Sequence, residues 1–413
     1  MPPGSVRPWE RLLARLRSAP PHDPPPSPRG ARRRMAKVAF AVFLKPWAVL
    51  CGFILLLLGR RGRLDPARIK RIAFIKLDHI GDAVMATPLL RALRAWAPDA
   101  EIIVFARPQS EDLFERLHSV SGVEEADVPW IRPDSSQWGN LKACHSLARR
   151  IRTLDCDLAI NLRYHNRLDS LLLSLCGARA KLGYDVGGLG FGITHRAPVP
   201  RAGHEIERGA AALRRFGVPV KGLMPEFPVQ QESARRVAAL LKSGPPIVAI
   251  HPGAGNAIKR WMPERFAEVA RELVLRKKVR IAVLGGPGEE SLGEPIIRAI
   301  PKSALVDMRG KLSLLDMASF MEKCALVIGN DGGPAHVSAA VGAPTLVVFS
   351  GTSAAKDWAP RGKRVRVIEK WVPCKPCHST TCPFNQDCLR AVTIDEVADS
   401  ALAMMTGNSR HRV

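Results

Sequence analysis

Apolar, strand-like runs alternate with helical segments twice along the chain, and this constrains the fold more than any other feature. In the first series a buried strand is predicted at 71–77, followed by a helix at 83–97 and a strand at 101–106. Pro88 is expected in the first turns of that helix. Strands alternating with helices form βαβ units around a parallel sheet. The series continues with strand 157–162, helix 168–176, a Gly- and Pro-rich loop at 183–203 and helix 204–216.

The pattern restarts at Pro246 and is complete in itself. We therefore predict an α/β fold with two Rossmann-like, doubly wound domains facing a cleft, where ligands bind beyond the carboxyl ends of the strands. The expected boundaries are an arm at 1–65, a domain at 66–235 and a domain at 236–413. The second series comprises strands 247–251, 280–284, 325–329 and 345–349, and helices 263–275, 312–323 and 333–341.

Positive charge is concentrated at the start of the chain. The formal net charge is +24, and residues 1–70 contain 15 Lys and Arg against 3 Asp and Glu, so half of the excess lies there. Such an arm can bind nucleic acid or anionic lipid. The absence of an aromatic-rich basic stripe argues against nucleic acid, and the neighbouring apolar run favours lipid.

The arm itself suggests contact with a membrane. Trp9, Leu12, Leu13 and Leu16 have the spacing of a short amphipathic helix, although a disordered tail explains them equally well. The apolar stretch 38–58 is about long enough to span a bilayer. Because Lys45-Pro46 interrupts it and a central charge is costly in lipid, a monotopic or re-entrant anchor is favoured over a full span.

Cysteine use indicates a reducing compartment, since a chain of this length does not need disulfides for stability. Four of the nine cysteines cluster at Cys374, Cys377, Cys382 and Cys388. Four thiols this close can bind zinc. The spacing is not that of a standard zinc finger, so a thiol-rich loop without metal is the other interpretation.

The first motif that can carry chemistry is KLDHIGD, which ends at Asp82 directly after the first strand. A carboxylate that faces a cleft from a strand-to-helix turn can act as general base on an acceptor hydroxyl. Asp at a helix N-terminus is also a common cap. Spacing alone leaves both roles open.

The second motif, HPGAGNAIKRW, places Lys259 after a strand and a Gly-rich loop. Backbone N–H groups and a lysine there can bind a diphosphate and stabilise it as it departs. A solvated basic loop is the alternative.

Two further motifs also follow strands. GGPGEE places Glu289 and Glu290 where a carboxylate can accept hydrogen bonds from ribose hydroxyls, although acids at a helix start explain it as well. GNDGGPAH presents Asp331, then the N–H groups of Gly332 and Gly333 at a helix start, which favours an anion. His336 follows on the first turn, either as a ligand-binding or as a structural histidine.

Together these motifs resemble glycosyltransferase family 9, the ADP-heptose:lipopolysaccharide heptosyltransferases, over residues 70–405. The resemblance rests on IKLDHIGDAVMATPLLRALR, HPGAGNAIKRWMPERFAEVA and GNDGGPAHVSAAVGAPTLVVFSGT, with support from HEIERGAAALRRFG and the cysteine-rich tail. Arm 1–65 is not part of the usual pattern.

The resemblance implies a GT-B fold, transfer with inversion and no required metal cofactor. It assigns Asp82 as the catalytic base and Lys259 as the lysine that binds the donor phosphates. It assigns Asp331 to the donor sugar, and places Glu289 or Glu290 near the nucleoside. Gly332, Gly333 and His336 match the helix start that binds phosphate and sugar.

The expected substrates are ADP-heptose and a lipid-linked core acceptor, at the cytoplasmic face of the inner membrane. Ala254 and Gly255 replace hydroxyl residues that family members often have before the lysine. Another nucleotide sugar for a different surface glycan is therefore the alternative. A non-catalytic membrane scaffold is disfavoured because Asp82, Lys259 and Asp331 are all present.

Overall fold

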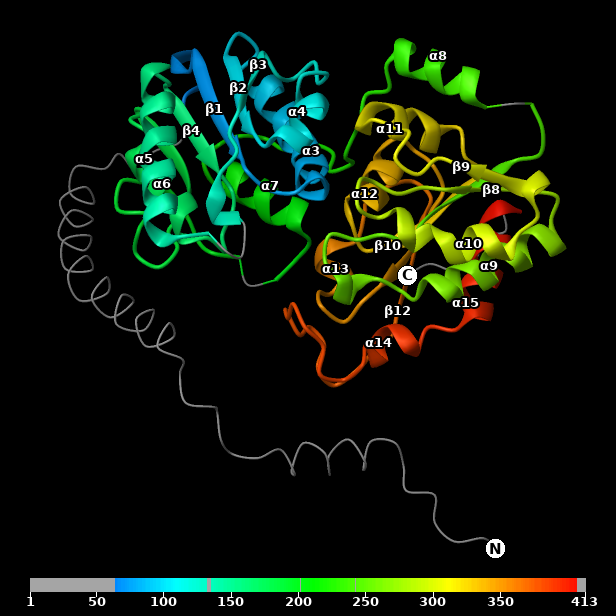
Figure 1. Cartoon of the computed structure of the whole chain (residues 1–413). Coiled ribbons are helices and arrows are strands. Elements are labelled where there is room, and N and C mark those ends of the chain that lie inside the picture. Colours follow the sequence, from blue (N-terminus) through cyan, green and yellow to red (C-terminus); the bar gives the residue numbers. More distant parts are fainter. Residues whose placement is uncertain (1–63, 132–134, 201, 242, 407–413) are drawn as a thin grey trace, which may run out of the picture. The chain divides into compact units, whose positions relative to one another are not determined.

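Two parallel sheets, each of six strands, dominate the part of the chain that the computed structural model describes, which is residues 64–131, 135–200, 202–241 and 243–406. The predictions for the N-terminal arm fall almost entirely outside these residues. Every strand pair in both sheets is parallel. The predicted α/β class with two doubly wound sheets is confirmed (Figure 1).

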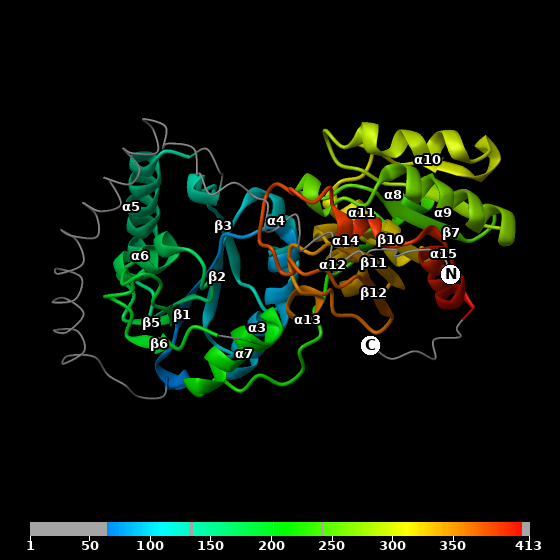
Figure 2. The same ribbon diagram turned by 90° about the horizontal axis from the view of Figure 1, so that it is seen from below.

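The N-terminal sheet has the strand order β3-β2-β1-β4-β5-β6. Helices α3, α4 and α7 cover one face of it and α5 and α6 the other, as Figure 2 shows. Its strands are β1 (Arg71–Lys76), β2 (Glu101–Ala106), β3 (Gly122–Glu125), β4 (Leu158–Asn161), β5 (Ala180–Tyr184) and β6 (His195–Ala197). Its helices are α3 (Ile80–Trp96), α4 (Pro108–Phe114), α5 (Gln137–Thr153), α6 (Arg167–Leu175) and α7 (Glu205–Arg215).

The C-terminal sheet repeats this arrangement in the order β12-β11-β10-β7-β8-β9. Its strands are β7 (Ile247–His251), β8 (Arg280–Val283), β9 (Leu305–Asp307), β10 (Leu326–Asn330), β11 (Thr345–Phe349) and β12 (Val365–Glu369). The helices of this half are α8 (Gln231–Leu240), α9 (Pro263–Arg276), α10 (Glu294–Ala299), α11 (Leu314–Glu322), α12 (Gly333–Ala340), α13 (Ala355–Trp358), α14 (Asp387–Arg390) and α15 (Ile394–Met405). Short 3-10 turns occupy Pro66–Arg68, Pro129–Ile131, Ala257–Lys259, Glu290–Gly293 and Lys302–Ala304.

Burial on both faces explains why the strands read as continuous apolar runs rather than as alternating ones. In β1, Ile72 and Phe74 enter the core on one side of the sheet, and Ala73 and Ile75 enter the core on the other. The first of these cores continues into the C-terminal half, where it includes Ala249 of β7. The two halves therefore share apolar packing within one compact unit.

Two expectations from the sequence are wrong. Helix α3 begins at Ile80 rather than at residue 83, and Pro88 lies in its interior. A proline there removes the N–H that would bond the carbonyl of Val84. The Thr87 hydroxyl donates to that carbonyl instead, at 2.9 Å, which compensates for the missing bond.

The segment expected to be a loop at 183–203 contains the end of β5 and all of β6. Gly183 is required inside β5, because a β-carbon there would lie 2.5 Å from the backbone carbonyl oxygen of Asn161 in β4 and 2.6 Å from Leu173 Cδ2 in α6. The glycine that suggested a loop thus permits close packing of strand and helix. No helix among the described residues is long and apolar enough to cross a membrane.

Candidate active site

Both sheets reverse their strand order beside their first strand, between β1 and β4 and between β7 and β10. Ligands of doubly wound sheets bind beyond the carboxyl ends of the strands at such switch points. Asp82 follows β1, Lys259 follows β7 and Asp331 follows β10. Three residues selected from the sequence therefore lie at the switch point of their own sheet.

Asp78 forms the centre of a buried ionic cluster at the first switch point. Its carboxylate lies 2.8 Å from Lys76 Nζ and 2.7 Å from Arg163 Nε. Burial alone would raise the pKa of Asp78, but the charges of Lys76 and Arg163 outweigh it and lower the pKa to about 2. Asp78 is thus a permanent anion that holds two cations in place.

Asp82 lies one turn further on and has a different environment. It occupies the first turn of α3, while His79 is the N-cap; the alternative role of Asp82 as N-cap is therefore wrong. Burial raises the pKa of Asp82, and the Asp78 charge raises it further. Neighbouring carboxyls with pKa values pushed apart are typical of acid–base sites. Because the Asp82 carboxylate forms no hydrogen bond with another described residue, it is available to a substrate hydroxyl.

Further ionisable groups surround this cluster, and the sequence motifs did not select them. Burial raises the pKa of Glu205 to about 7, with Lys76 opposing and Asp82 adding to the shift. The Tyr164 hydroxyl donates to Glu205 at 3.1 Å, and Arg208 donates to Tyr164. The sequence contains two signals for these groups: a polar run at 163–166 lies one residue after β4, and HEIER spans the N-cap and first turn of α7.

At the second switch point, Lys259 and Asp331 form an ion pair. Lys259 Nζ lies 2.7 Å from Asp331 Oδ2, and the Ser353 hydroxyl donates to the same oxygen at 3.1 Å. Ser353 follows β11 and was not selected from the sequence. The Asn330 side chain accepts from Trp261 N–H and donates to the Pro252 carbonyl, both within 3.0 Å. It therefore fixes the loop that carries Lys259.

Helix α12 begins beside this pair, with Gly332 as its N-cap and Gly333 as its first residue. No side chain caps it, and the Ala335 N–H already donates to the Gly332 carbonyl. The N–H groups of Gly332 and Gly333 are therefore the ones available to an anion. Burial lowers the pKa of His336 to about 4, so its imidazole is neutral at pH 7. The three residues lie where the sequence motif placed them.

Glu289 lies at the same edge but already has partners in the protein. Its carboxylate is 3.3 Å from His251 Nε2 and accepts from Gly286 N–H at 3.1 Å. The hydrogen bond from His251 lowers the pKa of Glu289, although burial opposes this. Gly253 lies against the same carboxylate, where a β-carbon would clash. Glu290 is exposed.

The two switch points are in contact through the starts of α3 and α12. A β-carbon on Gly81 would lie 3.0 Å from His336 Cδ2, and one on Gly333 would clash with Ile80 Cγ2. Gly333 leaves no room for a β-carbon at this approach, and Gly81 leaves little. The approach places the carboxylate of Asp82 in the turn that adjoins the anion-binding start of α12.

A second set of contacts joins the halves around α7. His204 Nε2 is 2.8 Å from the Ala359 carbonyl, and Arg208 is 3.6 Å from Asp357. Arg208 also donates to Tyr164, so it links the cluster around Asp82 to the C-terminal half.

The cysteine cluster does not form a metal site in this structure. Cys374, Cys377, Cys382 and Cys388 are free thiols, and no three metal-ligating side chains of the described residues converge on one point. Cys388 Sγ and Cys382 Sγ instead accept from the backbone N–H groups of Gly351 and Gln386, both at 3.2 Å.

Comparison with known proteins gives relatives of similar sequence and structures of the same fold. Lipooligosaccharide heptosyltransferase 2 of Campylobacter jejuni is 22% identical over 327 residues, covering 78% of this chain and 94% of the relative. The crystal structure of a family 9 glycosyl transferase from Veillonella parvula has a TM-score of 0.70 and 22% identity, covering 84% of this chain and 99% of that one. Escherichia coli heptosyltransferase WaaC with ADP-2-deoxy-2-fluoro heptose has a TM-score of 0.61 and 16% identity, covering 82% and 100%.

The family model described as glycosyltransferase family 9 (heptosyltransferase) matches residues 144–387, more than half of the 413 residues. That range includes Lys259 and Asp331, and the two similar structures share the arrangement of both halves. The chain belongs to glycosyltransferase family 9 and is a glycosyl-transferring enzyme.

Proposed function

We propose that this enzyme transfers a heptose from ADP-heptose to a lipid A-linked lipopolysaccharide core acceptor. The relatives are lipooligosaccharide and lipopolysaccharide heptosyltransferases, and a structural neighbour was solved with an ADP-heptose analogue. The observation that carries the proposal is the close approach of Gly81 to His336. A β-carbon on Gly81 would lie only 3.0 Å from His336 Cδ2. This approach sets a carboxylate with a raised pKa beside a helix start suited to a diphosphate.

In the proposed reaction the Asp82 carboxylate takes the proton of an acceptor hydroxyl. The hydroxyl oxygen forms a bond to the anomeric carbon as the bond from that carbon to the diphosphate oxygen breaks. Attack from the side opposite the leaving group inverts the configuration. The products are the glycosylated acceptor, ADP and a protonated Asp82.

The departing diphosphate gains negative charge, and this chain supplies the groups that stabilise it. Lys259 already lies beside Asp331, and the N–H groups at Gly332 and Gly333 open the uncapped α12. Preplaced donors of this kind contribute about 3–4 kcal/mol each to the transition state. We propose that Lys259 and the helix start together replace a divalent metal, so that transfer needs no cofactor.

We further propose that the reaction takes place at the cytoplasmic face of the inner membrane. Residues 1–70 carry 15 Lys and Arg, and a polybasic segment beside an apolar one favours an anionic leaflet. A lipid-linked acceptor would be presented at that surface.

Isothermal titration of the full chain with ADP, UDP and GDP, in the presence of EDTA, tests the donor. We expect selective binding of ADP, followed by heptose transfer to a purified core acceptor. A preference for UDP or GDP would contradict ADP-heptose and support a nucleotide sugar for another glycan. Binding of none of the three would contradict a sugar activated by any of these nucleoside diphosphates as the donor.

A further inference from the structure

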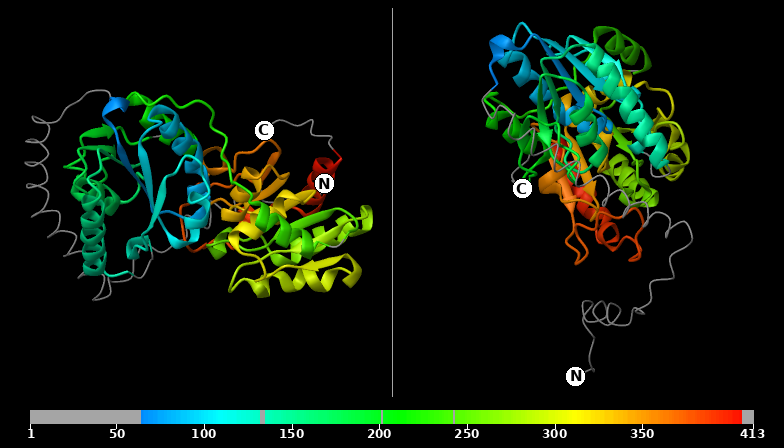
Figure 3. Two further views of the ribbon diagram at one scale, coloured as in Figure 1. Left: turned by 90° about the horizontal axis from the view of Figure 1, so that it is seen from above. Right: turned by 90° about the vertical axis from the view of Figure 1, so that its left-hand side faces the viewer.

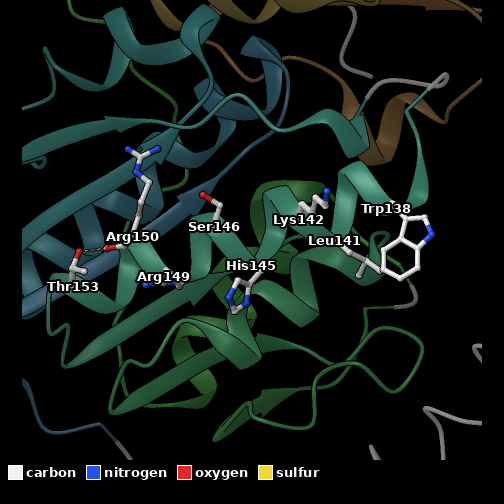
Figure 4. A pocket seen from close by; sticks show the side chains of 8 residues that line it. All are labelled: Trp138, Leu141, Lys142, His145, Ser146, Arg149, Arg150 and Thr153. Atoms are coloured by element: carbon white, nitrogen blue, oxygen red, sulfur yellow. Dashed lines mark hydrogen bonds between the residues drawn. The ribbon is translucent and has the colours of Figure 1, made fainter.

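One face of α5 carries cations and a tryptophan along its whole length. Trp138, Lys142, His145 and Arg149 follow one another at intervals of three or four residues, which places them on one stripe of the helix. All four are exposed, and Trp138 exposes 77% of its surface. They line a shallow groove of about 620 Å³ together with Leu141, Ser146, Arg150 and Thr153 (Figure 4).

This stripe has no counter-charge from its own helix. The α5 sequence, QWGNLKACHSLARRIRT, contains no Asp or Glu. Arg150 is paired with Glu124 at 2.7 Å. The side chains of Lys142, His145 and Arg149 form no hydrogen bond or ion pair with any residue that the structure describes. Two full positive charges are thus left for an external anionic partner.

The direction of α5 relates this stripe to the active site. Cys144 Sγ contacts the carbonyl of Leu168 at the start of α6, and Arg152 donates to Leu175 at the end of α6. The two helices therefore run in the same direction. They lie on the outer side of the N-terminal sheet, the side away from the C-terminal half (Figure 3). Helix α6 starts at the carboxyl edge of the N-terminal sheet, where Arg163 pairs with Asp169.

The opposite end of α5 lies near the start of the described chain. Arg71, the first residue of β1, donates to the Leu154 carbonyl at 2.6 Å. The apolar segment 38–58 ends only 13 residues before Arg71 in the sequence. A helix of 17 residues is about 25 Å long. The stripe thus extends from the carboxyl edge of the sheet, which carries the site, to the amino edge, where β1 begins.

We propose that the Trp138–Lys142–His145–Arg149 stripe is the surface that lies on an anionic phospholipid bilayer. Tryptophan favours the interface between headgroups and acyl chains, and lysine and arginine favour anionic headgroups. This rests on the proposed function, since a lipid-linked acceptor must reach Asp82 while its acyl chains remain in the membrane. A bilayer along α5 holds the carboxyl edge of the sheet beside that surface.

The experiment uses the full chain and vesicles of phosphatidylglycerol or phosphatidylcholine. The Lys142→Gln/Arg149→Gln variant is expected to bind phosphatidylglycerol vesicles about 30-fold more weakly, from roughly fivefold for each lost cation. The matched control Lys277→Gln/Lys278→Gln removes two exposed cations from the end of α9 and is expected to bind as the parent does. Because both variants keep the arm, their difference reports on α5. Equal binding of the two variants would overturn the proposal.

A second measurement locates the bilayer directly. A photoreactive side chain is placed at position 138, or at position 275, where Leu275 exposes 73% of its surface against 77% for Trp138. We expect cross-links to lipid from position 138 and few from position 275. Equal yields, or a cross-link to a second copy of the chain, would overturn the proposal. ADP titration without vesicles tests the proposed function separately.

Discussion

Lys259 Nζ lies 2.7 Å from Asp331 Oδ2, which joins the loop after β7 to the end of β10 across the switch point of the C-terminal sheet. The side chain of Asp331 is only 5% exposed, while that of Lys259 is 29% exposed. The buried carboxylate therefore holds a partly accessible ammonium beside the start of α12. A diphosphate would meet a cation that is already positioned, which lowers the ordering cost of binding.

Lys259→Ala should weaken ADP binding roughly 10- to 100-fold, since a hydrogen bond to a charged group contributes about 1.5–3 kcal/mol. Isothermal titration measures this change. The variant also leaves Asp331 without its cation, which should lower the free energy of unfolding. Lys259→Ala/Asp331→Asn removes that buried charge and serves as control. Weak ADP binding should persist in the double variant; recovery there would show that Lys259 acts through stability alone.

Asp82→Asn should leave ADP binding unchanged and reduce turnover by roughly 10²–10⁴, the range expected for a general base. The amide keeps the size of the side chain but cannot accept the proton. Titration with ADP and a heptose-transfer assay on one preparation separate the two effects. Turnover close to that of the parent would remove Asp82 from the mechanism.

The pH dependence of turnover tests the coupling of Asp78 to Asp82. A base must be ionised, so turnover should fall as the pH drops through the raised pKa of Asp82. Burial is the first cause of that raised pKa and the Asp78 charge is the second. Asp78→Asn removes the second cause and leaves Lys76 and Arg163 without their anion, and both changes lower the pKa of Asp82. We expect the acid limb to move to lower pH.

Asp157→Asn is the control for this profile. Its carboxylate accepts from the N–H groups of Lys70 and Arg71, at the amino edge of the same sheet. Loss of that charge should leave the acid limb in place. An unmoved limb in Asp78→Asn, or the same displacement in both variants, would contradict the coupling.

Much of the fold could be predicted because parallel strands buried on both faces appear in the sequence as short, continuous apolar runs. The predicted strands at 101–106, 247–251 and 345–349 have the observed bounds of β2, β7 and β11. The positions of Asp82, Lys259 and Asp331 could also be predicted, since residues that directly follow such strands meet at one edge. The start of α3 was predicted too late, because Pro88 was expected in the first turns of a helix. The hydrophobic periodicity of the sequence does not reveal that the Thr87 hydroxyl supplies the missing hydrogen bond.

Contacts between distant segments could not be predicted. Glu205 lies 123 positions after Asp82 in the sequence, and its place near Asp82 depends on the packing of α7 against α3. Ser353 meets Asp331 only because β11 pairs with β10. Arg163 could have been selected from the sequence, because it follows β4 in the same way that Lys259 follows β7.

Glu205→Gln should stabilise the protein increasingly as the pH rises from 5 to 8. Burial raises the pKa of Glu205 from its ordinary 4.5 to about 7. The folded state therefore binds this proton more tightly than the unfolded state, and the associated stability is lost as the pH rises through 7. The glutamine never ionises, so the difference in free energy of unfolding should approach about 3 kcal/mol at pH 8. Thermal unfolding at several pH values measures it.

Glu207→Gln, two residues further along the same helix, is the matched control. Glu207 is exposed and pairs with Arg361, and that hydrogen bond lowers the pKa of Glu207. Its contribution to stability is complete above pH 4.5 and is lost only in more acidic solution, so the effect of the substitution should stay constant from pH 5 to 8. A constant effect for Glu205→Gln as well would contradict burial as the cause of its pKa.

Gly333→Ala should separate the starts of α3 and α12, whereas Gly332→Ala should not. A β-carbon on Gly333 would clash with Ile80 Cγ2, but one on Gly332 would meet its nearest neighbours at 3.9 Å. Gly332 has φ −166°, an extended conformation that alanine adopts without strain. Overpacking costs about 1–3 kcal/mol, so Gly333→Ala should unfold at lower temperature. Turnover should fall with it, because the distance from Asp82 to the bound donor increases. Equal melting temperatures and equal turnover of the two variants would show that the contact between the two helix starts does not control the geometry of the site.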